Sequence, residues 1–260
     1  MKTKLPLIAL LISVCLSATS AQDFRLPPSS DLFQYSVPEG SVYGYSQPYK
    51  RIYGFPEVRI WGWSESGTVA YSVERFIEGR GGIVVSYIVF DLIEDKPLWI
   101  LQMDSIYYED VNEPSFLFAS FTDEKQDTSF LYFTYDLRKQ EIEEAFNKHG
   151  IIRHYINDYY KLPIQFNDRI YYCTASIVYE EEPQFYDFIR SYTITVETGG
   201  KMKTVAEVEE TDALSLYLCG YFISPFENRA VIITAEERFG WEGSELFYFF
   251  VGCDLERRFE

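Results

Sequence analysis

Histidine is scarce in this sequence, and its scarcity limits the chemistry that the chain can carry out. The two histidines, His149 and His154, are five positions apart, whereas two metal ligands on one helix face would be spaced at i, i+4. We interpret them as solvated groups near a helix end, where a histidine interacts favourably with the helix dipole. Serine hydrolases need a positioned base, usually a histidine, and the G-x-S-x-G nucleophile motif is also missing, because segment 62–66 (GWSES) lacks the final glycine. The sequence therefore argues against a serine hydrolase.

Cationic side chains are outnumbered by acidic ones. The chain has 23 Lys and Arg residues against 40 Asp and Glu residues, a formal net charge of -17 and a pI of about 4.6. Nucleic acid and anionic membrane surfaces bind basic patches, so neither is an expected partner. We interpret the acidic surface mainly as a source of solubility, and it is compatible with a protein or glycan partner.

The acidic residues do not predict a metal site, and no cofactor is expected. Asp123, Glu124 and Asp127 lie in one short polar segment, but a calcium loop needs alternating oxygen ligands around a central glycine, and neither is present. Paired carboxylates could also serve a glycosidase. Among 40 acidic residues accidental pairs are inevitable, so the sequence nominates no catalytic residue.

A long apolar stretch is absent after residue 21, which argues against a transmembrane segment. Before that point, Lys2 and Lys4 precede an apolar run at 5–16 and a small-residue segment that ends at Ala21. This pattern predicts a secretory signal peptide at residues 1–21, cleaved after Ala21. We therefore expect an exported protein, periplasmic or extracellular.

Cysteine is also rare. Cys15, inside the predicted signal peptide, could instead carry a lipid anchor, although Val14 stands where lipoprotein signals usually have a small residue. The other cysteines are Cys173, Cys219 and Cys253, an odd number with no recognisable disulfide spacing. Each lies in an apolar, strand-like context, so we interpret them as small buried hydrophobic residues. Whether any of them forms a disulfide stays open.

Aromatic residues are abundant and favour a mostly β fold, because they make up 18% of the chain. The best-defined stretch is 58–103. Within it, alternating side chains at 68–76 precede a glycine-rich turn at 79–82 and an almost continuous apolar run at 83–92. Pro97 stands where a fourth strand would begin, a position that tolerates a missing N–H. We interpret 58–103 as a four-stranded antiparallel unit.

The remaining chain resembles looser copies of this unit. Strand-like segments define a second copy at 116–137, a third at 162–208 and a fourth at 217–255. An Asp-Leu pair closes the apolar run of three copies, at Asp91, Asp136 and Asp254. The spacing is that of four-stranded propeller blades, provided that the longer copies carry insertions.

The fourth copy lacks a fourth strand, since only 256–260 follows its Asp-Leu pair. The lead-in at 22–56 contains five prolines and three glycines, which break any long element, but it also has short extended pieces. Unpaired sheet edges are avoided in proteins. We therefore predict that Ser41–Tyr53 pairs with the fourth copy and closes the ring.

One segment departs from the strand pattern. Residues 138–150 (RKQEIEEAFNKHG) are rich in helix formers, with Ile142, Ala145 and Phe146 at helical spacing and Gly150 as a stop signal. They predict one short helix near 138–149. A strand at 141–146 is the alternative.

A short motif suggests a family. Segment 63–71 (WSESGTVAY) is similar to the W-S-P-D-G-x-x-I-A-Y motif of TolB-like and WD40-like β-propeller blades, although the Pro-Asp pair is missing, and segment 224–228 (SPFEN) is a degenerate second instance. The resemblance implies a propeller fold, and such propellers are mostly binding platforms. Fold alone does not fix function.

These observations predict an all-β protein with a signal peptide (1–21), an extended lead-in (22–56) and one β-propeller-like domain (57–260) of four or five irregular four-stranded blades. A large antiparallel β-sandwich or barrel is the alternative fold. We expect an exported, non-catalytic binding or scaffolding module of the cell envelope, with a protein or glycan ligand held by loops at one face. The alternative is a glycan-acting hydrolase whose carboxylates, with raised pKa values, converge in a central funnel. Trp61, Trp63, Trp99 and Trp241 could stack on sugar rings, but core packing explains most such residues.

Overall fold

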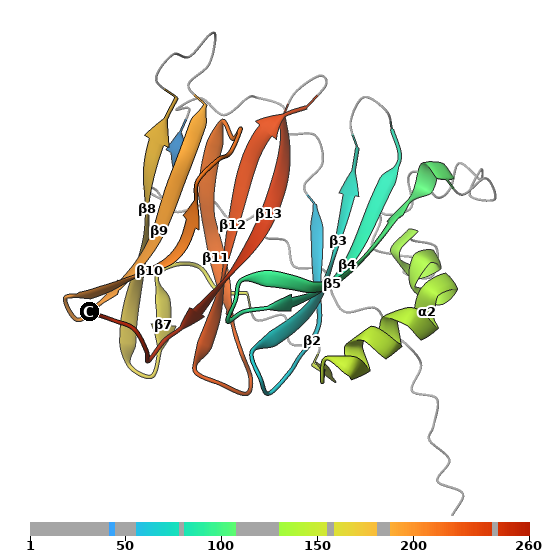
Figure 1. Ribbon diagram of the computed structural model, residues 1–260, viewed down its shortest axis with the longest axis horizontal. Helices are drawn as coiled ribbons and strands as arrows, with labels where there is room; N and C mark the ends of the chain where they lie inside the picture. Colours follow the sequence, from blue (N-terminus) through green and yellow to red (C-terminus); the bar gives the residue numbers. More distant parts are fainter. Residues whose placement is uncertain are drawn as a thin grey trace, which may run out of the picture.

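Three antiparallel β-sheets and one long helix make up the described part of the chain (Figure 1). The computed structural model describes residues 42–44, 56–77, 81–107, 130–154, 159–180, 188–240 and 244–260. The predicted signal peptide with Cys15, most of the lead-in, the acidic segment 123–127 and Trp241 lie outside the described residues. The expected all-β class is confirmed, and none of the three sheets is closed on itself.

The first sheet is the stretch that the sequence singles out. Its strands are β2 (Glu57–Trp63), β3 (Thr68–Phe76), β4 (Ile83–Asp91) and β5 (Lys96–Asp104), each antiparallel to the next. A short strand, β6 (Ile152–Arg153), is added beside β2, and a 3-10 turn, η1 (Ser105–Tyr107), follows β5. The predicted four-stranded unit at 58–103 is therefore confirmed. We call it the β2–β5 sheet.

The second sheet corresponds to the predicted third copy. It contains β7 (Ile164–Phe166), β8 (Arg169–Tyr179), β9 (Ile189–Thr198) and β10 (Lys201–Val208), paired in chain order. On β9, Tyr192, Ile194 and Val196 are buried, while the residues between them are half-exposed. This period of two is typical of a sheet with one face on the core and one in water.

The third sheet contains segments from both ends of the described chain. β11 (Ser215–Ile223), β12 (Arg229–Phe239) and β13 (Ser244–Asp254) form a meander, and β1 (Val42–Gly44) pairs with β11. The predicted pairing of the lead-in with the fourth copy is thus confirmed for residues 42–44. Because β1 lies on the β11 side, the sheet ends at β13 and no ring is closed.

The predicted second copy is wrong where the structure describes it. Residues 130–137, expected to be a strand, are the first half of α2 (Phe130–Lys148). The helix near 138–149 is confirmed and is longer than predicted, so the alternative strand at 141–146 is wrong. Aromatic residues, which favour strands, are frequent in this segment. Burying Phe130, Leu131, Thr134 and Tyr135 at helical spacing against the β2–β5 sheet outweighs that local preference.

Three apolar clusters hold the layers together. One lies between α2 and the β2–β5 sheet, a second between that sheet and the β11–β13 sheet, and a third between the β11–β13 and β7–β10 sheets. The β11–β13 sheet is therefore the central layer, and Figure 1 shows it between the other two with α2 on the outer face of the β2–β5 sheet. Trp61 belongs to the first cluster, where it stacks on Tyr135 at 5.1 Å.

The β2–β5 sheet and the central sheet repeat one local design. β2 and β11 each have a β-bulge next to a glycine, Gly62 and Gly220. A Cβ atom at Gly62 would lie 2.2 Å from the Ile152 carbonyl oxygen, and one at Gly220 would lie 2.4 Å from the Tyr160 carbonyl oxygen. In both sheets a neighbouring backbone therefore crosses at the bulge and excludes a side chain. The predicted first and fourth copies therefore share this feature at Gly62 and Gly220.

Candidate functional site

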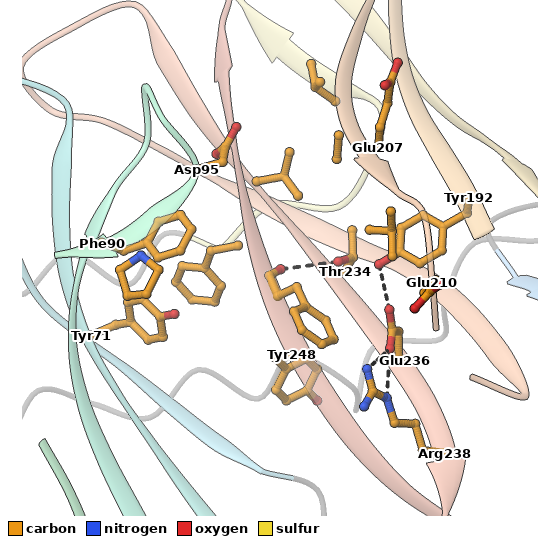
Figure 2. Close-up of a pocket in the computed structure, with 17 residues that line it drawn as sticks. Tyr71, Phe90, Asp95, Tyr192, Glu207, Glu210, Thr234, Glu236, Arg238 and Tyr248 are labelled. Carbon is orange, nitrogen blue, oxygen red and sulfur yellow. Dashed lines mark hydrogen bonds and ion pairs between the residues drawn. The ribbon is translucent and has the colours of Figure 1, made fainter. Parts of the chain in front are cut away.

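A groove with a volume of ≈ 590 Å³ runs along β13, between the two outer sheets. Its walls come from β3–β5 on one side and from β9 and β10 on the other, and its floor comes from β12 and β13 (Figure 2). Four consecutive residues of β13, 248–251, line it. Successive residues of a strand point to opposite faces. The groove therefore reaches both faces of the central sheet around the β13 edge.

Aromatic rings form the wall next to the β2–β5 sheet. Tyr71 on β3 stacks on Phe250 of β13 at 4.0 Å, and Phe90 on β4 meets Tyr71 edge-on at 6.4 Å. Burial raises the pKa of Tyr71 far above its usual value, so the ring keeps a neutral hydroxyl. Tyr71 and Phe250 are themselves buried, so the half-buried Phe90 supplies most of the aromatic surface that this wall offers to a ligand.

The opposite side of the groove is polar and is organised by Glu236 on β12. Its carboxylate accepts hydrogen bonds from the Tyr192 hydroxyl at 2.7 Å, the Thr211 hydroxyl at 3.0 Å and Arg238 Nε at 2.9 Å. Arg238 also pairs with Asp212 at 3.1 Å. Glu236 is 1% exposed, so these donors satisfy a charge that would otherwise be buried alone. Its carboxylate is held in a structural network.

Asp95, in the turn between β4 and β5, closes one end of the groove. Its Oδ1 accepts the backbone N–H of Gly252, on β13, at 2.7 Å. Burial raises the pKa of Asp95 to about 6, an effect that the Gly252 hydrogen bond and Arg229 partly oppose. The contact fastens the β2–β5 sheet to the outer edge of the central sheet.

Exposed carboxylates lie on the β10 side of the same groove. Glu207 on β10 and Glu210 just after it both line the groove and are solvent-exposed. Glu207 is paired with Thr193 on the solvent face of its sheet and its carboxylate points away from the groove, so Glu210 and Asp95 are the exposed acidic residues of the two walls (Figure 2). Among the described residues no group of three or more His, Cys, Asp or Glu side chains is placed to hold a metal ion.

The histidines and cysteines do not meet in this groove. His149 follows the end of α2, as predicted, and burial and Lys148 lower its pKa, while His154 follows β6, with its ring 6.3 Å from that of Phe226. Cys173, Cys219 and Cys253 are free thiols on β8, β11 and β13. Burial raises the pKa of all three, that of Cys253 to about 11. They are therefore thiols rather than nucleophilic thiolates near neutral pH.

Sequence reasoning missed the groove residues, although one signal was available. β12 reads RAVIITAEERF, so two glutamates interrupt an otherwise apolar, buried strand. A buried acidic residue needs partners, and Glu236 finds them on β9, β12 and the segment after β10. The aromatic wall gave no comparable signal, because Tyr71 and Phe250 look like ordinary core residues.

No family model, curated protein or solved structure matches this chain. In the described part of the chain, no helix has the length and apolar character needed to cross a membrane. Function must therefore be inferred from the groove itself.

Proposed function

We propose that the protein is a non-catalytic binding module and that its ligand lies in the groove along β13. The observation that carries this proposal is the combination of an aromatic wall with carboxylates that already have protein partners. Glu236 is held by three donors and Asp95 by a backbone N–H. Such groups orient a ligand at the wall rather than exchange protons with it.

The proposal extends to architecture and location. The three sheets are irregular blades of a propeller-like fold, which their face-to-face packing and the repeated glycine bulge support. Residues 1–21 support export, so the module acts in the cell envelope or outside the cell.

A glycan-acting hydrolase is the second candidate, and Asp95 is the observation that favours it. Its pKa of about 6 would suit a general acid, and Glu207 and Glu210 line the same groove. Release of a chromophore from aryl glycosides by the wild-type protein, abolished by Asp95→Asn, would establish this activity. Absence of turnover in the presence of groove binding supports the binding module.

Binding can be tested with a variant that fills the groove. Val208 on β10 is half-buried and lines the groove, so Val208→Trp should occupy ligand space. Val178 on β8 is 55% exposed and does not line the groove, and Val178→Trp is the matched control. Peptide and glycan arrays should give signals for the wild type and the control that are lost for Val208→Trp. Equal signals for all three proteins would refute a ligand site in the groove.

A further inference from the structure

The central sheet lacks a strand that both outer sheets have. β5 lies beside β4, and β10 lies beside β9, whereas β13 is the last strand of its sheet in the described chain. The sheets are comparable at this point, because β4 and β13 end in the same turn. Asp91 Oδ1 accepts the N–H groups of the two residues that follow Leu92, and Asp254 Oδ1 accepts those that follow Leu255.

After this shared turn the two chains diverge. β4 continues into β5, which pairs back along it. After β13 the chain crosses instead to the β7–β10 sheet, where Glu260 and Met202 exchange backbone hydrogen bonds of 3.0 and 3.2 Å. The groove occupies the position at the β13 edge that the missing strand would take.

The backbone groups at this edge face the groove. Gly252 N–H reaches Asp95 on one flank, and the Asp254 carbonyl oxygen accepts from Lys203 on the other flank. In an antiparallel ladder alternate residues direct their N–H and C=O groups to the same edge. The backbone N–H and C=O groups of Phe250 and Leu246 therefore point to the same edge as those of Gly252, toward the position of a fourth strand.

The β5 flank displays apolar side chains toward that position. On β5, Trp99, Leu101 and Met103 pack on the α2 side. Ile100, opposite Ile88 of β4, lies on the other face of the sheet, and Leu98 is the unpaired residue of a β-bulge next to it. Ile100 is 54% exposed and Leu98 is 37% exposed. A strand beside β13 would cover Ile100.

The β10 flank differs in chemistry, because it carries the exposed Glu210, whereas Glu207 is paired with Thr193 and lies on the opposite, solvent face of this sheet. A strand placed between the flanks points alternate side chains to each. Apolar residues would meet the aromatic and aliphatic wall, and cationic residues would meet Glu210. The two flanks therefore specify an alternating sequence.

We infer that the edge of β13 binds an extended peptide segment of a partner protein, with alternating apolar and cationic residues, as a fourth strand of the central sheet. This inference rests on the proposed binding function and names its ligand class. Strand addition gains affinity from backbone hydrogen bonds and specificity from alternate side-chain positions. A second copy of this chain does not fit, because its own β13 edge is recessed between the same flanking sheets.

The test uses the whole protein and synthetic peptides of roughly eight residues, long enough to span a typical strand. Fluorescence anisotropy should show binding of an alternating Val/Lys peptide and not of a Val/Glu peptide. Two further Val/Lys peptides carry N-methyl groups on one or the other set of alternate residues. N-methylation should abolish binding only when it falls on the set of residues whose N–H groups face β13. Equal binding of the two methylated peptides would overturn strand addition.

Charge reversal tests the assigned flank. Glu210→Lys should weaken the Val/Lys peptide by about tenfold or more. Glu197→Lys, at an exposed position of the same sheet that does not line the groove, adds the same charge and should have little effect. Equal weakening by both variants would overturn the placement. If Val208→Trp abolishes glycan binding while no peptide binds, the strand inference fails and the proposed binding function stands.

Discussion

The carboxyl group of Glu74 shows at the scale of one residue how burial shapes this protein. Glu74 lies on β3, is 8% exposed, and has a buried Oε2 without a hydrogen-bond partner. Burial raises its pKa to about 7, and the charge of Glu57 adds to the shift. The matching residue of the central sheet, Glu237, accepts hydrogen bonds from the Tyr217 and Ser244 hydroxyls, each at 2.6 Å. The carboxylate at this position thus has hydroxyl donors in the central sheet, whereas in the β2–β5 sheet one of its oxygens is buried without a hydrogen-bond partner.

Removing the Glu74 charge should change how stability depends on pH. An acid whose pKa is raised from 4.5 to about 7 by folding contributes stability that is complete below 4.5 and is lost as the pH rises through 7. We expect Glu74→Gln to remove most of this loss, which amounts to about 3 kcal/mol. Urea unfolding on either side of this window measures the effect. Glu65→Gln, in an exposed turn, should leave the wild-type pH dependence intact, and an unchanged dependence in Glu74→Gln would contradict the assignment.

At the scale of the element, α2 marks where sequence reasoning succeeded and where it failed. The charged half, 138–148, was predictable from helix formers at the right spacing. The aromatic half, 130–137, is rich in residues that favour strands and was therefore predicted to be one. Its helical state depends on the face of the β2–β5 sheet that it covers, a long-range contact that no local pattern contains. The strands of the first, third and fourth copies were predictable because tight turns and apolar runs agree there.

Hydrogen bonds from Tyr87 should decide how firmly α2 is held. The Tyr87 hydroxyl, on β4, donates to the Leu131 carbonyl oxygen at 2.8 Å and lies 3.0 Å from the Thr134 hydroxyl. Tyr87→Phe keeps the buried ring and removes these contacts, so we expect a loss of about 1 kcal/mol. Hydrogen exchange should show faster opening of α2 amides with little change in β11–β13. Tyr172→Phe, at a residue 56% exposed, is the control, and unchanged α2 protection in Tyr87→Phe would contradict the role.

At the scale of the whole molecule, the groove exists because the central sheet ends at β13 in the described chain, whereas each outer sheet has one more strand at this position, β5 or β10. Each wall belongs to a different sheet, and the walls are far apart in sequence, as Tyr71 and Tyr192 illustrate. The strand pattern of the sequence predicted that the fourth copy has only three strands of its own. It cannot show that the neighbouring sheets extend past the third strand and leave a cavity beside it, because that depends on how the layers pack.

The shared central sheet should make the layers unfold as one unit. Ile232 and Ile233 are neighbours on β12, yet Ile232 packs toward the β7–β10 sheet and Ile233 toward the β2–β5 sheet. Ile232→Ala should cost about 3 kcal/mol by leaving a cavity. Trp61, Trp63 and Trp99 all lie in the β2–β5 sheet, so tryptophan fluorescence in a Trp241→Phe background reports the layer that Ile232 does not touch. In a cooperative molecule the fluorescence transition and the far-UV circular dichroism transition shift together to lower urea. Ile170→Ala, at a residue 45% exposed, should shift neither, whereas a fluorescence transition left unmoved by Ile232→Ala would mean that the sheets unfold separately.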